Sequence, residues 1–443
     1  MPSVQPEVAA TWDVHVVADS DTRWKWGAAL AHQLSGAGTS RVHGHLLDGR
    51  AAPNDRQLHD VGADAVSLTR GGLTDVLQEL ADTEAEIVVL ACVGGAIQAL
   101  LHGLAQAWQG RQSRPVVVTG YVGVVYERVV DGLLLRAGAD IVLANSAADA
   151  RSFRAVYEAV GVDPDTIARI ALPFLGNAPH DPTAAGRTRP FTVTFVAQPS
   201  VPETRAERRY AMDQVLEHAR RHPDREVIVK LRGRKGEQTT HSEPYHYAKL
   251  VPEGSLPANV RFAYGSMSRV LDRTDLCVTV SSTAALEAMH RGIPVGILTD
   301  FGIREALGNQ VFVSSGALVS WPELHDGAVP KTDPAWAADN GVGDADQQNP
   351  TDPWSEVHAR LRRLTAQHDS LAPLHPKYSP DNAAAYLPGL LSRHGLQTDG
   401  TALRGDIDQR ARPARRVLRA AARRAYLVGT ARIEPRLRRW ANS

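Results

Sequence analysis

The sequence predicts an α/β protein in which two Rossmann-like domains follow one another along the chain and face a central cleft. Over residues 1–175, short apolar runs alternate with longer amphipathic stretches, and the same alternation restarts over residues 191–320. This pattern is typical of parallel sheets, whose strands are buried on both faces beneath covering helices. Between the two stretches lies segment 176–190, which is rich in Pro, Gly, Ala and Thr and indicates an interdomain linker.

Each apolar run is expected to form one strand of a sheet. In the first domain the expected strands are 13–19, 42–48, 86–92, 114–121, 140–146 and 169–174, and the expected helices are 24–35, 73–83, 96–108 and 147–160. In the second domain the expected strands are 191–198, 226–232, 259–265, 276–282 and 295–301, with a helix over 203–221.

The remainder of the chain differs in composition from the two domains. Residues 321–403 are rich in Pro, Asp and Gly, with one helical pattern at 354–368, and we expect an irregular, partly helical and partly disordered surface excursion. Residues 404–443 contain 12 arginines and three acidic residues, and we expect an Arg-rich amphipathic helical tail. Its stretch 412–440 is a candidate for docking on an anionic membrane surface, and a solvated tail or a helix packed on the first domain are equally open.

Overall composition narrows the function classes. The 49 basic and 49 acidic side chains cancel, so we expect no general binding of nucleic acid. Cys92 and Cys277 lie in apolar strand-like runs, which indicates buried thiols in a reducing compartment. The first residues lack the pattern of a signal peptide, and no apolar run approaches the ~18 residues of a membrane span. We therefore expect a cytoplasmic protein, with peripheral attachment to the inner face of the cell membrane through the tail as a further option.

Polar side chains follow one strand of the second domain at its carboxyl end, where parallel sheets bind their ligands. Ser281, Ser282 and Thr283 lie between the strand 276–282 and a helix start, whose free N–H groups favour an anion. Hydroxyls there suit a phosphate, and the nearby carboxylate of Glu287 suits ribose or base hydroxyls. Because hydroxyls at this position often only cap the helix, the sequence leaves both roles open.

Cations stand at the end of a second strand, 226–232. Lys230 and Arg232 occupy this end in "VKLRGRK", and an arginine fork can hold phosphate oxygens bidentately. Taken alone, such a loop is more often a solvated turn. Gln198 ends the first strand of the same domain, near the expected hinge. The cations and the hydroxyls together favour a phosphate-binding site.

Motifs for other common ligands are missing where they would be expected. No G-x-G-x-x-G follows the first strand of either domain and no Walker sequence occurs, which disfavours dinucleotide redox chemistry and P-loop ATP hydrolysis. His241 and His246, just past the basic loop, show neither H-x-x-x-H nor H-E-x-x-H spacing. We therefore expect no metal site and no resident cofactor.

Carboxylates in the first domain are candidates for a general base. Asp19 and Asp21 flank Ser20 where the first strand meets the first helix, and Asp131 lies between two later strands. The alternative is that Asp19 or Ser20 caps the helix, with the following tryptophans in the core. For Asp131 the alternative is an ordinary surface carboxylate on a helix.

At this point the sequence resembles the GT-B glycosyltransferases over residues 12–320. More narrowly, it resembles bacterial polysialyltransferases and capsule-polymer transferases, and an actinobacterial glycosyltransferase group. In those enzymes a Ser-Ser pair opening a helix binds the donor phosphate, which corresponds to Ser281 and Ser282. Their His-Pro motif is replaced here by "KLRGRK", so Lys230 and Arg232 would substitute for it, and a CMP-sugar donor is not assured.

The resemblance also implies a base and a mechanism. The acidic-acidic-Gly motif of the family is matched by "VDG" at 130–132, where Asp131 is the one acidic residue before the glycine. The activity implied is metal-independent, inverting transfer from a CMP- or UDP-type nucleotide-sugar donor to a cell-envelope glycan or lipid-linked acceptor. Asp131, or alternatively Asp21 or Asp19, would deprotonate the acceptor hydroxyl.

Two other functions fit the same architecture. A nucleotide-sugar 2-epimerase shares the two domains and a serine-containing turn, but it would release free UDP and an altered sugar with no acceptor present. A non-catalytic protein that recruits partners to a membrane through the tail would tolerate the loss of every cleft carboxylate.

Overall fold

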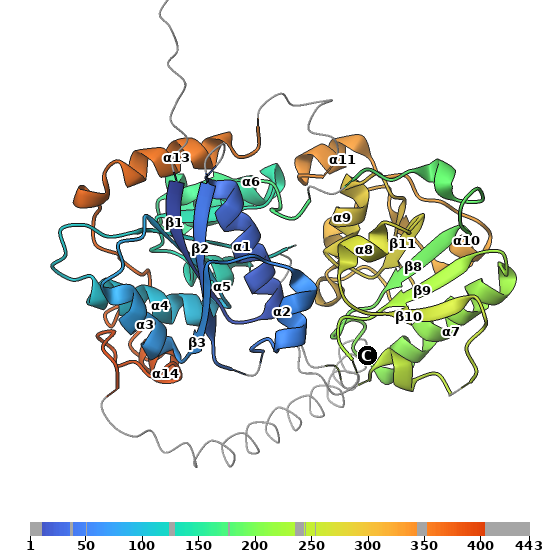
Figure 1. Cartoon of the computed structure of the whole chain (residues 1–443), viewed down its shortest axis with the longest axis horizontal. Helices are drawn as coiled ribbons and strands as arrows, with labels where there is room; N and C mark the ends of the chain where they lie inside the picture. Colours follow the sequence, from blue (N-terminus) through green and yellow to red (C-terminus); the bar gives the residue numbers. More distant parts are fainter. Residues whose placement is uncertain are drawn as a thin grey trace, which may run out of the picture. The chain divides into compact units, whose positions relative to one another are not determined.

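The computed structural model describes residues 11–35, 39–49, 51–123, 129–175, 178–234, 243, 245–252, 254–342 and 352–403. Residues up to Ala402 belong to one compact unit, which contains two parallel sheets (Figure 1). The Arg-rich tail, with its candidate membrane-binding stretch 412–440, lies outside the described residues, as does His241. In the described part of the chain, no helix combines the length and the apolar character needed to cross a membrane.

The first sheet has the strand order β3-β2-β1-β4-β5-β6-β7, with every pair parallel. Its strands are β1 (Thr11–Ala18), β2 (Thr39–Leu47), β3 (Ser67–Gly71), β4 (Ile87–Ala91), β5 (Val116–Gly120), β6 (Ile141–Ala144) and β7 (Ile167–Arg169). The helices of this domain are α1 (Asp21–Leu34), α2 (Asp55–Val61), α3 (Leu73–Ala81), α4 (Gly94–Ala107), α5 (Val129–Leu134) and α6 (Ala147–Ala159).

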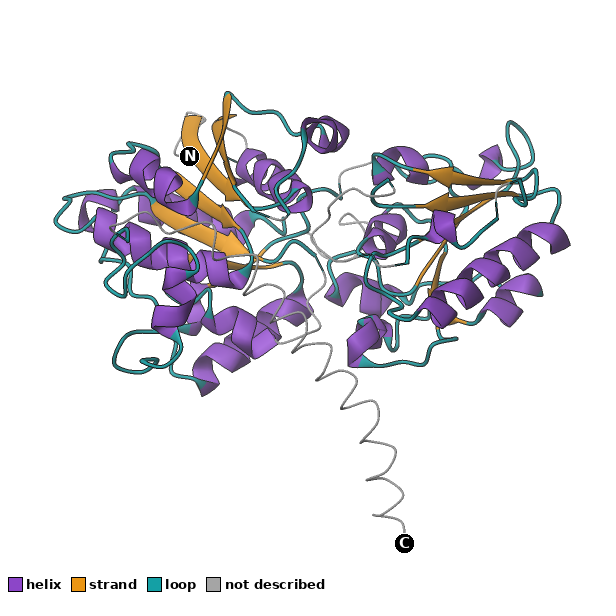
Figure 2. Ribbon diagram, turned by 90° about the horizontal axis from the view of Figure 1, so that it is seen from below, coloured by secondary structure: helices purple, strands orange, loops and turns teal. Residues whose placement is uncertain are grey.

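The second sheet has the order β10-β9-β8-β11-β12-β13 and is also parallel. Its strands are β8 (Thr192–Val196), β9 (Glu226–Lys230), β10 (Val260–Ala263), β11 (Leu276–Thr279), β12 (Val295–Leu298) and β13 (Leu318–Val319). Its helices are α7 (Arg205–Arg221), α8 (Met267–Leu271) and α9 (Ala284–His290). Helices cover the sheets of both domains (Figure 2), which confirms the predicted pair of Rossmann-like domains.

The elements differ from the prediction mainly at the edges of the sheets. The strand expected at 169–174 was wrong, because β7 ends at Arg169. Pro173 has no N–H for a ladder, and Leu172 and Leu175 instead enter a core cluster with residues of the second domain. The short edge strands β3 and β13 were not predicted, since neither contains the apolar run that marks a central strand.

Segment 321–403 packs on both domains, whereas the sequence predicted an irregular surface excursion. It contains α10 (Trp321–His325), α11 (Pro334–Asp339), α13 (Ser355–Thr365) and α14 (Leu387–Ser392). Val357 and Leu361 of α13 are buried in the core on one face of the first sheet. Leu387 and Leu390 of α14 are buried in the core on its other face. The chain therefore returns to the first domain after completing the second, and α13 and α14 lie beside it in Figure 1.

Tight packing of α1 on β1 and β4 fixes the start of α1, whose first residue is the candidate carboxylate Asp21. Trp24 and Trp26 are buried in this core, as the core alternative for them predicts. Gly27 allows the helix to approach the sheet, because a Cβ at this position would lie 2.5 Å from Val16 Cγ1 and 3.0 Å from Ala91 Cβ. Cys92 and Cys277 are buried and free, as predicted.

We predict that Gly27→Ala lowers the free energy of unfolding by about 1–2 kcal/mol, since overpacking outweighs the gain of ~1 kcal/mol in helix propensity. The matched control is Gly389→Ala in α14, where nothing lies within 4 Å of the new Cβ. That variant should be as stable as the parent or slightly more so. Urea unfolding of the three proteins measures the difference, and a Gly27→Ala protein as stable as Gly389→Ala would contradict the close approach.

Candidate functional site

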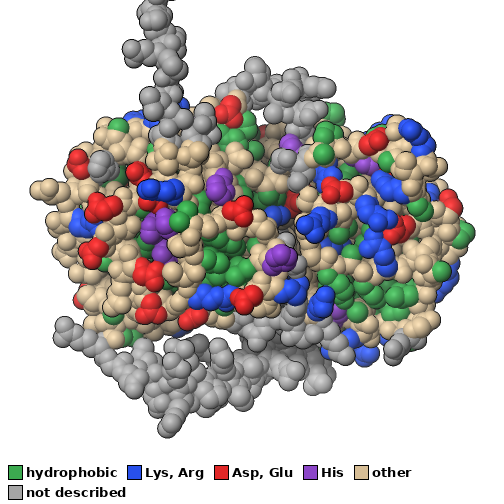
Figure 3. All heavy atoms as spheres, viewed as in Figure 1, with side chains coloured by type: hydrophobic (Ala, Val, Ile, Leu, Met, Phe, Trp, Pro, Cys, Tyr) green, Lys and Arg blue, Asp and Glu red, His purple; other side chains and the backbone are tan. Residues whose placement is uncertain are grey.

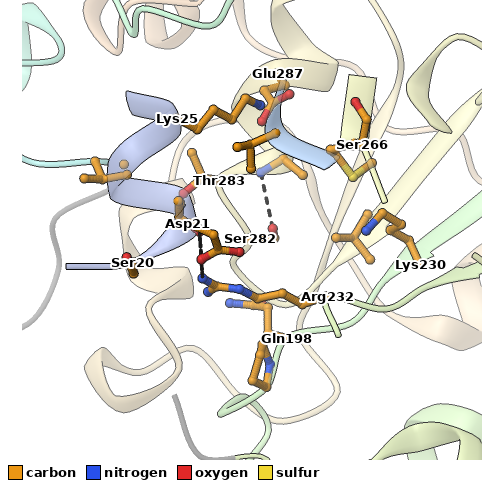
Figure 4. A pocket seen from close by; sticks show the side chains of 18 of the residues that line it. Ser20, Asp21, Lys25, Gln198, Lys230, Arg232, Ser266, Ser282, Thr283 and Glu287 are labelled. Atoms are coloured by element: carbon orange, nitrogen blue, oxygen red, sulfur yellow. Dashed lines mark hydrogen bonds and ion pairs between the residues drawn. The ribbon is translucent and has the colours of Figure 1, made fainter. Parts of the chain in front are cut away.

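A cavity of about 470 Å³ lies where the carboxyl ends of β8, β9 and β11 face the N-terminus of α1 (Figure 4). Most of the residues predicted for the site line it, namely Asp21, Gln198, Lys230, Arg232, Ser281, Ser282, Thr283 and Glu287. The structure therefore brings together residues from both domains that are up to 266 positions apart in sequence, from Asp21 to Glu287. Asp19 and Asp131 are not among the lining residues.

Cations line the cavity from both domains. Lys230 is the last residue of β9 and is 7% exposed, with its Nζ donating to the carbonyl of Leu231 at 2.8 Å. Arg232 follows it on the same wall, and Lys25 of α1 lies on the first-domain side. On the face shown in Figure 3, other Lys and Arg side chains gather over the second domain. An anion that enters the cavity would meet positive charge on two sides.

One ion pair crosses the cavity. Arg232 Nη2 lies 3.0 Å from Asp21 Oδ1 and donates to Thr22 Oγ1 at 2.6 Å. Both charged side chains are largely shielded from solvent, being 25% and 19% exposed. The guanidinium from the end of β9 therefore holds the carboxylate that begins α1.

Ser281 and Gln198 hold the turn after β11 in place. The Ser281 N–H donates to Gln198 Oε1 at 2.9 Å, and Gln198 Nε2 donates to Ser281 Oγ at 3.2 Å. The Ser281 hydroxyl in turn donates to the carbonyl of Leu307 at 2.5 Å. Because its proton is already used within the protein, Ser281 positions the turn, and the hydroxyls of the next two residues are better placed for a ligand.

Ser282 and Thr283 divide between the two roles that the sequence leaves open. Ser282 Oγ accepts from the N–H of Ala284 at 3.2 Å, so it caps the first turn of α9. Thr283 is the N-cap residue but makes no side-chain cap bond, and within the described residues its hydroxyl has no hydrogen-bond partner. Since α9 spans only seven residues, the side-chain cations of the cavity are better candidates for holding an anion than the helix end.

Glu287 places a buried carboxylate on the same wall. It is 7% exposed, and within the described residues its Oε2 atom is buried without a hydrogen-bond partner. Burial raises the pKa of Glu287, and the charges of Lys25, Arg291 and Lys230 oppose this rise. Figure 4 shows the Lys25 ammonium pointing toward this carboxylate. An unsatisfied buried acceptor beside a cavity is suited to a ligand hydroxyl.

Asp19 and Ser20 have structural partners. Ser20 is the N-cap of α1 and accepts from the N–H of Arg23, as the capping alternative predicts. Asp19 Oδ1 accepts from Arg23 Nη1 at 2.9 Å, and its Oδ2 accepts from the N–H of Val93 at 2.9 Å. With both oxygens engaged, Asp19 positions the end of β1, whereas Asp21 lines the cavity.

Asp131 lies elsewhere. It is exposed on α5 and lines a separate hollow of the first domain, together with Tyr121 and Tyr378. The structure therefore does not bring the candidate from "VDG" to the cavity that holds the other predicted residues. Among the described residues, no cluster of three or more His, Cys, Asp or Glu side chains is arranged to hold a metal ion.

The sequence also matches a known family. A profile of the family described as "Putative glycosyltransferase (DUF6716)" matches residues 14–361. The chain belongs to this family. The predicted enzyme class, a glycosyltransferase, is thereby confirmed, and none of the curated proteins searched matches the sequence.

Three solved structures illustrate what this glycosyltransferase is similar to. The UDP-GlcNAc 2-epimerase from Neisseria meningitidis, bound to UDP-GlcNAc, is 11% identical over 80% of this chain and 99% of its own, with a TM-score of 0.50. A UDP-GlcNAc 2-epimerase from Methanocaldococcus jannaschii covers 80% and 99% at 11% identity and a TM-score of 0.47. A UDP-glucosyltransferase from Polygonum tinctorium covers 82% and 95% at 12% identity and a TM-score of 0.45. The first likeness supports the GT-B fold.

Several lining residues were not predicted, for example Lys25, Ser266 and Arg56. Lys25 lies one helical turn after Asp21, so the spacing of α1 places both side chains on one face and could have identified it. Ser266 follows the carboxyl end of β10, where the rule that identified Lys230 also applies. Arg56 lies on α2, a helix for which the sequence shows no clear apolar period.

We predict that Glu287→Gln raises the melting temperature at pH 8 and has little effect near pH 4.5. Burial raises the pKa of Glu287 above its ordinary 4.5, so near pH 4.5 the buried side chain is neutral in the folded state. As the pH rises through the raised pKa, the buried carboxylate becomes charged and destabilises the folded state. The matched control is Glu158→Gln, at an exposed position of α6, which should show no such pH dependence. A Glu287→Gln protein that is less stable than the parent at pH 8 would contradict the assigned cost of burial.

Proposed function

We propose that this glycosyltransferase moves a sugar, with inversion and without a metal, from a UDP- or CMP-type donor to a cell-envelope glycan or lipid-linked acceptor. The observation that carries the proposal is the convergence of three cations, an unsatisfied buried carboxylate and a base candidate in one cavity. These residues are Lys25, Lys230, Arg232, Glu287 and Asp21. No resident cofactor is required, because the nucleotide-sugar itself supplies the activated bond.

The second-domain wall is suited to the donor nucleotide. Lys230 and Arg232 would bind the phosphate oxygens, and the open Thr283 hydroxyl would donate to them. Glu287 would accept from ribose hydroxyls, which would satisfy its Oε2 atom. The Neisseria epimerase of the same fold was solved with UDP-GlcNAc, and for this reason UDP-sugars are the first donors to test.

Asp21 is the base that we favour. Arg232 forms an ion pair with Asp21, and the donor phosphate would compete for the same guanidinium. Transfer of Arg232 to the phosphate would leave Asp21 free to take the proton of the acceptor hydroxyl. The acceptor oxygen then forms a bond to the anomeric carbon while the bond from that carbon to the phosphate oxygen breaks. The leaving nucleotide keeps the electron pair, and Lys230 and Arg232 stabilise its new charge.

The 2-epimerase function remains the second candidate because of the likeness in fold. An epimerase would consume UDP-GlcNAc with no acceptor present, whereas a transferase would need one. Membrane attachment through 412–440 is a further proposal, supported by the 12 arginines and three acidic residues of the tail. Sedimentation with vesicles containing phosphatidylglycerol, compared with neutral vesicles, tests it.

We predict that UDP or CMP raises the melting temperature of the protein, because a ligand at ~100 times its Kd adds ~2.7 kcal/mol of stability. Arg232→Lys should lower the affinity for this nucleotide by a factor of about 10 or more, since a lysine cannot form the bidentate contact. The matched control is Arg41→Lys on β2, whose guanidinium is paired with Asp13 on the neighbouring strand β1. If neither UDP, CMP, GDP, ADP nor TDP shifts the melting temperature of the folded wild type, the donor site is refuted.

We predict that Asp21→Asn reduces sugar transfer by ~10²-fold or more, as expected when a general base is removed. The same variant should bind the nucleotide at least as tightly as the wild type, because Asn no longer competes for Arg232 as a charged partner. Nucleotide release from the donor, measured with a panel of p-nitrophenyl glycosides as acceptors, gives the rate. Asp19→Asn is the comparison. If that change abolishes transfer while Asp21→Asn does not, the base is wrongly assigned.

A further inference from the structure

A second hollow of about 770 Å³ lies on the first domain, outside the donor cavity. One side is formed by the end of β5 and by α5, with Tyr121, Asp131 and Gly132. The other side comes from the segment before α14, with Tyr378 and Tyr386. This segment is held on the first domain by hydrogen bonds from His102 Nε2 to the Tyr378 carbonyl, at 3.0 Å, and from the Lys377 ammonium to the Val160 carbonyl, at 2.9 Å.

Two tyrosine rings form one wall of the hollow. The ring centroids of Tyr378 and Tyr386 lie 5.5 Å apart with an interplanar angle of 60°, and Tyr386 is 45% exposed. A tyrosine offers a rigid apolar face with a polar tip at little cost in conformational entropy. The C–H face of a pyranose ring matches such a surface, because the sugar hydroxyls point outward around its rim.

Asp131 supplies the polar contact. Its carboxylate is exposed, and within the described residues it makes no hydrogen bond or ion pair. The pKa of Tyr378 is raised by burial and, in smaller part, by Tyr386 and by the charge of Asp131, which is consistent with the carboxylate lying near that hydroxyl. A free carboxylate beside an aromatic wall can accept hydrogen bonds from sugar hydroxyls.

The floor of the hollow is held rigidly. Arg136 is buried and donates to the carbonyls of Gly120 and Gly132, each at 2.9 Å. Its guanidinium lies over the Tyr121 ring, 3.8 Å from the centroid. Gly132 leaves room for this ring, because a Cβ there would lie 2.3 Å from Tyr121 Oη. These contacts fix the end of β5 against α5.

Consecutive residues after β5 line the hollow and then the donor cavity. Tyr121 lines the hollow, and the next two residues, Val122 and Gly123, line the donor cavity. A ligand in the hollow therefore lies beside the same strand end as the donor. We propose that this hollow binds the glycan acceptor, with Tyr386 and Tyr378 packing on pyranose rings and Asp131 accepting from their hydroxyls. This proposal rests on the transferase function proposed above and gives Asp131 a binding role in place of a catalytic one.

A glycan microarray of bacterial envelope oligosaccharides, probed with the labelled full chain, tests the proposal. The wild type should bind a subset of the glycans, and Tyr386→Ala and Asp131→Asn should each lower that signal at least 10-fold. Tyr386→Phe should retain it, because the ring face is kept. Tyr245→Ala, at an exposed tyrosine of the second domain, is the matched control and should bind as the wild type does.

Nucleotide thermal shifts of the same proteins separate this proposal from the transferase function. In every variant the nucleotide should raise the melting temperature as much as in the wild type. This result also verifies that the variant is folded. Glycan binding that survives both Tyr386→Ala and Asp131→Asn overturns the proposal, as does a wild type that binds nucleotide but none of the glycans. If the Asp131→Asn variant still binds the glycan but no longer transfers the sugar, the binding role is wrong and Asp131 is the base. If no nucleotide raises the melting temperature of the wild type, the donor site is refuted instead.

Discussion

The ion pair between Arg232 and Asp21 connects the end of β9 with the start of α1, and the chemistry of the cavity follows from it. Each partner is largely shielded from water, so each charge is stabilised by the other. Each is also the group that the proposed reaction requires for another purpose. In the proposed reaction a phosphate that takes Arg232 would release the carboxylate, so donor binding and activation of the base would be one event.

The remaining charges of the cavity favour the same ligand. Lys25 and Lys230 add positive charge, while Glu287 is a carboxylate whose pKa is raised by burial. The pocket is thus better prepared for an anion than for a cation. Meanwhile the internal hydrogen bonds of Ser281 with Gln198 and Leu307 keep the turn after β11 rigid, which holds Thr283 at the cavity wall. The hydroxyls of Ser281 and Ser282 are thus used within the protein, and that of Thr283 is the one proposed to contact the donor.

Much of this could be read from the sequence, because parallel strands bring their carboxyl ends to one edge. That rule places Lys230, Arg232 and Thr283 together although they come from different strands. It could not rank Asp21 against Asp131, since both follow strands of the first sheet and only the fold shows which one faces the second domain. It also could not find Tyr386. This residue belongs to a segment that returns to the first domain through tertiary contacts without a local sequence pattern.

A crystal structure of the protein with the nucleotide that stabilises it would test the account most directly. The account predicts phosphate oxygens within hydrogen-bond distance of Arg232 and Lys230, ribose hydroxyls on Glu287, and an Arg232 guanidinium that has left Asp21. A nucleotide phosphate bound away from these cations, or an Arg232 that stays on Asp21 while the donor site is filled, would contradict it.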